Sequence, residues 1–275
     1  MIDIHTHILP NIDDGARSIE ETFNLIKEAR EAGFDAIVST AHYKEGYYET
    51  DTPEREVWVN AIYENLQAKN IDVMLYLGNE IFLSENMIKF LEEGRASTIN
   101  DTSYVLFELP LDEEPIELYD MIDEMRKYKI VPILAHPERC SYIQKDPELV
   151  YDLIQKGVLM QANFGSIIGE YGRKAQFIVK KLLENDMIHL LSTDVHRENT
   201  IYPKIPQILS ELKDLIGEER TNKLTTDNPK LVLNNKRIDI EEPSIIEIEL
   251  KEKLFMLKYN SFDKLNKVMN KITKK

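Results

Sequence analysis

Seven short apolar runs alternate with helical patterns along the chain, and this alternation limits the possible folds more than any other feature. Strand-like runs that are separated by helices are typical of a mostly parallel sheet. If such a sheet closes into a barrel, its functional residues lie at the C-terminal ends of the strands. The predicted strands span residues 2–9, 35–42, 72–80, 103–110, 129–137, 157–164 and 187–196.

The clearest helical stretch covers residues 18–33. Ser18 and Glu21 have the spacing of a capping box, and Gly33 suits the C-terminal stop. The periodicity predicts an apolar face made of Ile19, Phe23, Ile26 and Ala29.

The composition restricts the class of protein. A net charge of −15 argues against broad nucleic-acid binding, which relies on a basic surface. No apolar run approaches the roughly 20 residues that a membrane-spanning helix needs, and the N-terminus lacks the basic segment of a signal peptide. The single cysteine, Cys140, excludes an internal disulfide and fits a reducing compartment, so we expect a cytoplasmic protein.

The chain divides into two predicted parts: a catalytic barrel over residues 1–236 and a C-terminal extension over residues 237–275. In the extension, residues 241–250 alternate like a strand, and the lysine-rich stretch after them is predicted to be helical. The eight lysines of residues 251–275 could contact an anionic membrane surface or the acidic barrel of another subunit. An ordinary amphipathic helix packed on its own domain is the alternative.

Histidines and carboxylates recur at the ends of the predicted strands. Side chains two residues apart on a strand share a face, so His5 and His7 point together, as do Asp194 and His196. Imidazole and carboxylate ligands favour Mn, Fe or Zn, and a carboxylate can bridge two ions in a binuclear or trinuclear centre. The set at the strand ends consists of His5, His7, His42, Glu80, Glu108, His136, Asp194 and His196.

Three acidic or imidazole side chains near this set need separate treatment. His189 lies five residues before Asp194, so strand alternation sends it to the opposite face, where we expect a structural role against the helices. Asp13 and Asp14 cannot be separated by the pattern alone. Either could bind metal, while the other forms an Asx turn or a loop cap before Gly15.

Seven stretches, in this order, resemble the polymerase-and-histidinol-phosphatase (PHP) family, and within it the bacterial manganese-dependent protein tyrosine phosphatases encoded with capsule and exopolysaccharide genes. The resemblance extends over about residues 1–236. The stretches are DIHTHILPNIDDG (3–15), STAHY (39–43), GNEIF (78–82), FELP (107–110), AHPER (135–139), STDVH (192–196) and DNPKLVL (227–233).

The resemblance implies a distorted TIM-like barrel of seven strands that holds two or three Mn²⁺ ions, with Fe or Zn as alternatives at some positions. Its motif positions assign the first ion to His5, His7, Glu80 and Asp194, and they make Glu80 a bridge to a second ion at Glu108 and His136. The same positions assign the third ion to Asp14, His42 and His196, and they favour Asp14 over Asp13 as the metal ligand. Arg139 matches the family's phosphate-binding arginine, and Arg197 is the candidate for a second one.

The expected reaction is hydrolysis of a phosphomonoester by metal-bound hydroxide, without a phosphocysteine. The resemblance implies that the substrate is the tyrosine-rich tail of a membrane-associated bacterial tyrosine kinase that regulates capsular polysaccharide synthesis. Three alternatives stay open: a phosphatase for a small molecule such as histidinol phosphate, a nuclease-like PHP module, and a metal-containing scaffold that binds a kinase without chemistry.

Three further motifs bear on this expectation. A cysteine-based phosphatase needs the pattern C-x5-R, but Asp146 stands where that arginine would follow Cys140, so we expect a buried, inert thiol. Tyr43, Tyr47 and Tyr48 either wall the pocket or pack within their own loop. GSIIGEYG (165–172) has the wrong spacing for a nucleotide-binding loop and predicts either a loop at the barrel mouth or an ordinary turn.

Overall fold

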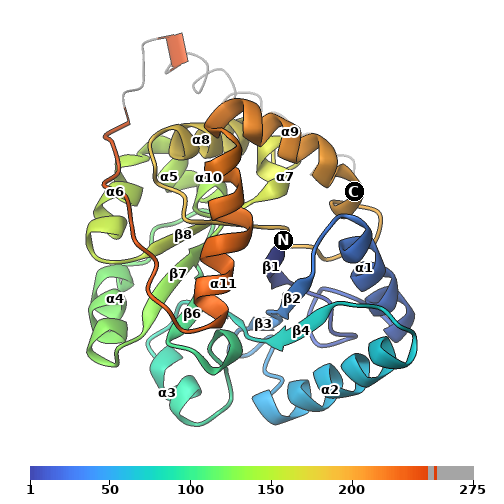
Figure 1. Ribbon diagram of the computed structural model, residues 1–275. Coiled ribbons are helices and arrows are strands. Elements are labelled where there is room, and N and C mark those ends of the chain that lie inside the picture. Colours follow the sequence, from blue (N-terminus) through green and yellow to red (C-terminus); the bar gives the residue numbers. More distant parts are fainter. Residues whose placement is uncertain (247–250, 253–275) are drawn as a thin grey trace, which may run out of the picture.

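The computed structural model describes residues 1–246 and 251–252, and it has the predicted α/β architecture with parallel strands and outer helices (Figure 1). The strands are β1 (Ile2–Thr6), β2 (Ala36–Ser39), β3 (His42–Tyr43), β4 (Met74–Leu77), β5 (Glu80–Phe82), β6 (Tyr104–Glu108), β7 (Val131–Ala135), β8 (Leu159–Asn163) and β9 (Leu190–Ser192). The helices are α1 (Ile19–Glu31), α2 (Thr52–Ala68), α3 (Met87–Glu92), α4 (Leu118–Lys127), α5 (Ser141–Lys145), α6 (Glu148–Gln155), α7 (Phe164–Ile167), α8 (Arg173–Glu184), α9 (Ile205–Ile216), α10 (Glu218–Asn222) and α11 (Asn228–Leu233).

The strands form two parallel sheets, with the orders β1-β2-β4 and β3-β5-β6-β7-β8-β9. Each sheet continues into the other, because β3 follows β2 directly along the chain and β5 follows β4 in the same way. At the other edge, a parallel bridge joins Thr6, at the end of β1, to Val195, just after β9. The seven predicted runs are therefore all present, and two of them are broken into pairs of short strands.

The two breaks lie at Thr40–Ala41 and at Gly78–Asn79, just before two of the strand-end residues. The second break is held by the fully buried guanidinium of Arg55, whose Nη1 donates to the carbonyl of Gly78 at 2.7 Å. Asn79 ties the breaks together, since its Nδ2 donates to the carbonyl of Ala41 at 2.7 Å. These hydrogen bonds fix the direction of the backbone at the breaks, just before the strands resume at His42 and at Glu80.

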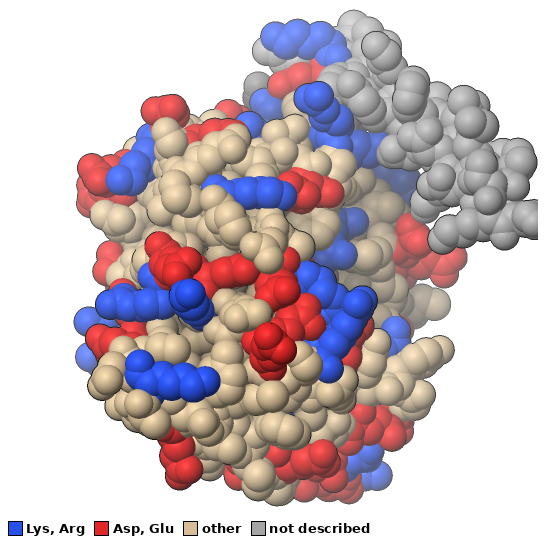
Figure 2. Space-filling view, turned by 90° about the vertical axis from the view of Figure 1, so that its right-hand side faces the viewer, with Lys and Arg blue, Asp and Glu red and all other residues tan. Residues whose placement is uncertain are grey.

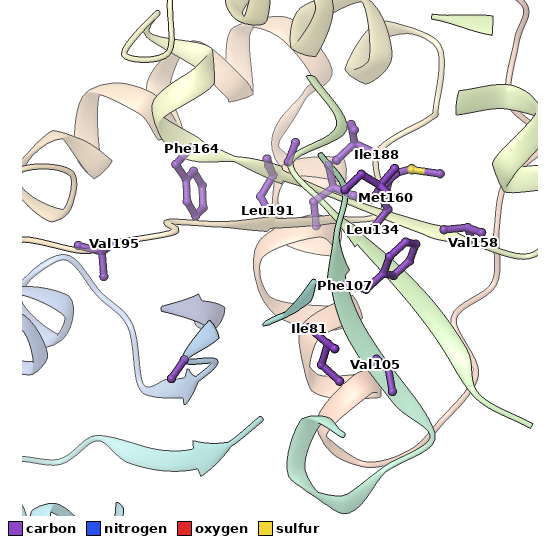
Figure 3. Close-up of a cluster of buried hydrophobic side chains, with 14 of the residues drawn as sticks. Ile81, Val105, Phe107, Leu134, Val158, Met160, Phe164, Ile188, Leu191 and Val195 are labelled. Atoms are coloured by element: carbon purple, nitrogen blue, oxygen red, sulfur yellow. The ribbon is translucent and has the colours of Figure 1, made fainter. Parts of the chain in front are cut away.

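Two hydrophobic clusters hold the sheets and helices together. The larger one packs the helix-facing sides of the strands against the helices, and Figure 3 shows its residues on successive strands, including Phe107, Leu134 and Leu191. The smaller cluster contains Leu106 and Leu159 and is closed at one end by Val232 of α11. Since residues two apart share a strand face, this cluster continues along the strands into the polar side chains at their C-terminal ends.

Helix α1 begins and ends near the predicted positions. Ser18 is the N-cap, and its Oγ accepts from Glu21 N at 3.2 Å. The return bond differs from a standard capping box, because Glu21 Oε2 accepts from Arg17 N instead of Ser18 N. The predicted apolar face was wrong at Ile19, which is 43% exposed. The buried stripe consists instead of Thr22, Leu25, Ile26 and Ala29.

The C-terminal extension departs from the prediction where it is described. Residues 241–246 form no strand; instead Ile238 and Ile246 are buried in the two hydrophobic clusters, so this segment packs against the domain without pairing with a sheet. Residues 247–250, which complete the predicted strand, and most of the predicted lysine-rich helix lie outside the described residues. None of the helices within the described part of the chain has the length and apolar character needed to cross a bilayer.

His189 lies on the helix side of its strand, near Arg220 and Lys223. Its Nδ1 accepts from the Met160 backbone N–H at 3.0 Å, and its carbonyl accepts from Asn228 Nδ2 at 2.8 Å. Burial, with a smaller contribution from the two nearby cations, lowers the pKa of His189 to about 4. The neutral ring is therefore part of the folded structure.

This burial predicts a pH-dependent stability. Above the ordinary pKa of 6.5 the ring is neutral in both the folded and the unfolded chain, so it adds no pH dependence. As the pH falls from 6.5 towards 4, only the unfolded chain takes up the proton, so the folded protein loses up to about 3 kcal/mol. His189→Asn keeps an acceptor for Met160 and does not titrate. In urea unfolding, the stability advantage of the wild type over His189→Asn should shrink from pH 7.5 to pH 4.5, and a constant difference would contradict the assignment.

Candidate metal centre

The ends and breaks of the strands and the loops that follow them bring all nine expected metal-binding side chains into one basin. Backbone position fixes several of them: His5 lies on β1, His42 begins β3 and Glu80 begins β5. His136 follows β7 in the left-handed region, with φ of 36°. Within the described residues, three groups place ligand atoms within 4.8 Å of one another: His5, His7, Glu80 and Asp194; His42, Glu80 and Glu108; and His7, Asp14, His42 and His196.

The first group is deeply buried and has the spacing of ligands to a common ion. His5 Nε2 lies 3.2 Å from His7 Nε2 and 3.1 Å from Glu80 Oε2. Asp194 Oδ1 lies 3.4 Å from the Nε2 atoms of both histidines. Ligands that sit about 2.0–2.2 Å from one ion are about 3.0–3.5 Å from each other. The four atoms therefore fit a single divalent metal.

Glu80 faces two sides of the basin with its two oxygens. Its Oε1 lies 2.9 Å from His136 Nε2, while its Oε2 lies 3.1 Å from His5 Nε2, 3.3 Å from His7 Nε2 and 3.0 Å from His42 Nδ1. This is the arrangement of a carboxylate that can bridge two ions. It also differs in one detail from the expected ligand sets, because His42 stands close to Glu80 as well as to the third group.

The third group lies at the more exposed edge of the basin. Asp14 Oδ1 is 3.3 Å from His196 Nε2 and 3.5 Å from His42 Nε2. His42 also belongs to the second group, in which its Nδ1 lies 3.1 Å from Glu108 Oε1. The rings of His7 and His196 stack with centroids 4.0 Å apart. One imidazole, His42, therefore connects the second and third groups.

Partners behind the basin orient three of the histidines. His5 Nδ1 lies 2.7 Å from Gln161 Oε1, and His7 Nδ1 lies 2.7 Å from Asp13 Oδ2. His196 Nδ1 lies 2.9 Å from a backbone carbonyl. Because each of these partners is an acceptor, each Nδ1 carries a proton, and the Nε2 lone pair faces the basin. Sequence reasoning missed Gln161, for which strand parity was the only available signal.

The electrostatics of the basin match a binding site for cations. Burial disfavours the charged ring of His5, but the nearby carboxylates outweigh burial and raise the pKa of His5. Burial likewise disfavours charge on His42, yet Glu80 and its neighbours raise the pKa of His42 to about 10. Burial alone would raise the pKa of Glu80, but the histidines hold it well below the ordinary value. The Glu80 carboxylate thus stays ionised, and protons compete with metal for the imidazoles.

Unpaired atoms provide an independent test of the metal assignment. Glu80 Oε2 and His42 Nδ1 lie 3.0 Å apart, yet neither makes a hydrogen bond of ordinary geometry among the described residues, and the buried Nδ1 of His136 makes none either. Buried polar atoms without a partner are rare, and an ion is one of the few explanations for such a group. Nitrogen and oxygen donors in this combination suit Mn, Fe or Zn. The residues therefore fit a multinuclear centre of divalent ions.

The two arginines of the predicted site have different surroundings. Arg139 Nη1 donates to Asp194 Oδ2 at 2.7 Å, and its guanidinium lies 4.4 Å from the ring centroid of Tyr171. Arg139 thus lies at the edge of the first group. Arg197 Nη1 donates to the carbonyls of Gly15 and His196, so this atom joins two loops at the third group. Any contact of Arg197 with a ligand would have to come from its other nitrogens.

The structure separates the two neighbouring aspartates. Asp14 faces the basin, whereas Asp13 lies behind it, where its Oδ2 also accepts from His42 N at 2.9 Å and its Oδ1 accepts from Gly15 N at 2.8 Å. A side chain at position 15 is excluded, because an added Cβ would lie 2.1 Å from the carbonyl oxygen of His7. Asp13 therefore stabilises the turn at Gly15 by accepting from its backbone N–H, and it also orients the ring of His7.

The tyrosines after His42 do not act as a unit. Tyr43 is buried in the core, while the ring of Tyr48 stacks on His42 with centroids 5.7 Å apart. Tyr47 is 76% exposed and contacts Lys44. Only Tyr48 therefore walls the basin, and the other two pack elsewhere.

Comparisons with known proteins find relatives that match most of the chain. The family described as capsular polysaccharide synthesis, CpsB/CapC, matches residues 1–234. The CapC protein of Staphylococcus aureus is 31% identical over 245 residues, which cover 89% of this chain and 95% of CapC. The tyrosine-protein phosphatase YwqE of Bacillus subtilis is 29% identical over 255 residues, covering 93% of this chain and 99% of YwqE.

Solved structures extend the comparison. A chain from the crystal structures of YwqE and of CpsB from Streptococcus pneumoniae, described as metal-dependent tyrosine phosphatases, matches with a TM-score of 0.85 at 29% identity. The match covers 90% of this chain and 100% of that chain. The histidinol phosphate phosphatase of Lactococcus lactis matches with a TM-score of 0.54 at 13% identity, which shows a shared fold alone.

The position of Asp13 predicts a role in metal affinity. Asp13→Ala removes the Nδ1 partner of His7 and should weaken binding of Mn²⁺ by about 10- to 100-fold, as measured by competition with a chelator. Asp72→Ala, an exposed aspartate outside the basin, serves as the matched control and should bind Mn²⁺ like the wild type. Equal affinities for the two variants would remove Asp13 from the metal centre.

Proposed function

Since the chain belongs to the CpsB/CapC family of capsular polysaccharide synthesis, we propose that it is a metal-dependent phosphatase that hydrolyses phosphotyrosine in a protein. The observation that carries this proposal is the position of Arg139. Its guanidinium lies beside a carboxylate of a buried group of four metal-binding side chains. A planar guanidinium can contact two phosphoryl oxygens at once, so arginine and metal ligands together suit a phosphomonoester.

The proposed ligands are the nine side chains of the basin: His5, His7, Asp14, His42, Glu80, Glu108, His136, Asp194 and His196. We propose Mn²⁺ as the native ion, in two or three copies. Divalent ions bound there would lower the pKa of a coordinated water and neutralise phosphoryl oxygens. Binding and orientation of the substrate would depend on side chains of the protein itself.

Arg139 would bind the phosphoryl group, and its orientation is fixed before the substrate arrives. Asp194 Oδ2 accepts from Arg139 Nη1 and also from Asn163 Nδ2, both at 2.7 Å. The guanidinium also packs against the ring of Tyr171. Such positioning lowers the entropic cost of aligning the phosphoryl group for attack. Arg197 stays in the proposal as a second phosphate ligand, acting through the nitrogens that do not bond to backbone carbonyls.

The proposed reaction has no phosphocysteine intermediate. Cys140 is fully buried, and burial raises the pKa of its thiol to about 12. A neutral, inaccessible thiol is a poor nucleophile, because the thiolate is the reactive form. This environment supports direct hydrolysis by water at the metal centre.

The partner and place of action are also part of the proposal. We propose that the substrate is the tyrosine-rich tail of a membrane-associated tyrosine kinase in capsule or exopolysaccharide regulation, and that the enzyme acts in the cytoplasm. The lysine-rich stretch after residue 250 would contact an anionic membrane surface or another subunit. A nuclease role has less support, because Figure 2 shows acidic side chains interspersed with basic ones across the face that it presents.

Two substitutions separate the metal mechanism from a cysteine mechanism. His136→Ala should abolish hydrolysis of a phosphotyrosine peptide at saturating Mn²⁺, because it removes the imidazole beside Glu80 Oε1. Cys140→Ser should keep most of the activity, because the thiol is buried and protonated. Active His136→Ala together with inactive Cys140→Ser would refute a metal mechanism.

A comparison of hydrolysis rates for two phosphate esters tests which substrate the enzyme prefers. After metal removal with a chelator, hydrolysis should cease, and added Mn²⁺ should restore it more fully than Fe²⁺ or Zn²⁺. The restored enzyme should prefer a phosphotyrosine peptide over histidinol phosphate by at least about tenfold in kcat/KM. A preference for histidinol phosphate would favour the small-molecule alternative. Metal binding with no turnover of either ester would favour the scaffold.

A further inference from the structure

The glycine-rich stretch GSIIGEYG (165–172) forms one wall of a cavity beside the metal centre. It contains most of the short helix α7 and a turn in which Gly169 and Gly172 have φ values of 85° and 94°, a region that favours glycine. The opposite wall is the segment that follows β9. The cavity has a volume of about 140 Å³ and is lined by Gly165, Glu170, Tyr171, Thr193, Asp194, Val195, Thr200 and Ile201.

Two side chains connect this cavity to the phosphate-binding edge of the basin. Asp194 lines the cavity and also belongs to the first ligand group. Tyr171 lines the cavity, and its ring lies 4.4 Å from Arg139 Cζ. Arg139 is itself bonded to Asp194. The cavity is therefore bordered by the two side chains that contact the Arg139 guanidinium.

The size and the walls of the cavity suit one aromatic ring. An apolar protein cavity of about 150 Å³ can hold benzene. Here the walls include the phenol ring of Tyr171 and the apolar side chains of Val195 and Ile201. Gly165 leaves room for the tyrosine ring, since an added Cβ would lie 3.1 Å from Tyr171 Cε2. Aromatic pairs add stabilisation beyond burial of their area.

The polar side chains of the cavity already have partners, so they do not require a charged ligand. Glu170 forms an ion pair with Lys204 at 2.5 Å. Thr193 Oγ1 donates to Asp3 Oδ2 at 2.6 Å, and Thr200 Oγ1 donates to a backbone carbonyl at 2.6 Å. The space between them is therefore suited to an uncharged, flat group.

We propose that this cavity is the subsite for the aromatic ring of an aryl phosphate, with the ring on Tyr171 and the ester oxygen directed towards Arg139. The proposal rests on the phosphatase function proposed above and adds the side chains that select an aromatic over an aliphatic ester. It assigns the GSIIGEYG stretch to substrate recognition.

Filling the cavity tests this assignment. Thr200 is an exposed residue in the lining of the cavity. The substitution Thr200→Phe would fill the cavity with an aromatic side chain of the protein itself. We expect the ratio of kcat/KM for phenyl phosphate to that for glycerol phosphate to fall by about tenfold or more, with most of the change in KM for phenyl phosphate. Asn60→Phe, which adds the same ring to the exposed surface of α2, is the control and should leave the ratio unchanged.

A binding measurement separates this proposal from the proposed activity. In calorimetry with Mn²⁺-saturated protein, the wild type should bind phenylphosphonate more tightly than methylphosphonate, and Thr200→Phe should lose that preference. If wild type and Thr200→Phe show the same preference, or the same kcat/KM ratio, the subsite is refuted while the phosphatase function stands. If the wild type has the preference and hydrolyses neither ester, the phosphatase function fails and the aromatic subsite stands.

Discussion

The carboxylate of Glu80 is the group on which the whole site depends. It is fully buried, its two oxygens face four imidazoles, and one of these oxygens makes no hydrogen bond of ordinary geometry among the described residues. Burying an ionised carboxylate is costly unless positive charge compensates it. Cations shared between the ligand groups, or protons on the histidines, supply that compensation. The strands around Glu80 bring four imidazoles close to its carboxylate, so that the compensating positive charge can be supplied there.

A buried arginine outside the basin holds this arrangement in place. Arg55 is buried and fixes the chain just before Glu80, where its guanidinium donates to the neutral oxygens of Gly78, Thr52 and Thr50. Burial lowers the pKa of Arg55 to about 10, which still leaves it charged at neutral pH. The basin therefore depends on partners outside it, as is common for metal sites whose ligands are oriented by hydrogen bonds from behind.

Much of the fold and of the ligand set could be predicted from the sequence, because both follow from short-range periodicity. Seven strand-like runs predict a parallel sheet, and parity places His5 beside His7. The failures have a different origin. Ile19 has the periodicity of a core residue but lies at the first turn of α1, beyond the packed surface. Residues 241–246 alternate like a strand, but in the described part of the chain they pair with no strand, and Ile246 is instead buried in the larger hydrophobic cluster.

The sequence by itself determined which residue types stand at the strand ends, since a two-residue period and the position of each run are local properties. Only the tertiary structure decided how those residues are grouped. It turned the two oxygens of Glu80 to different partners, moved Asp13 behind His7 while Asp14 faces the basin, and brought the turn at Tyr171 against Arg139. These contacts join segments far apart in the chain. They depend on strand breaks and loop packing, and no local pattern encodes them.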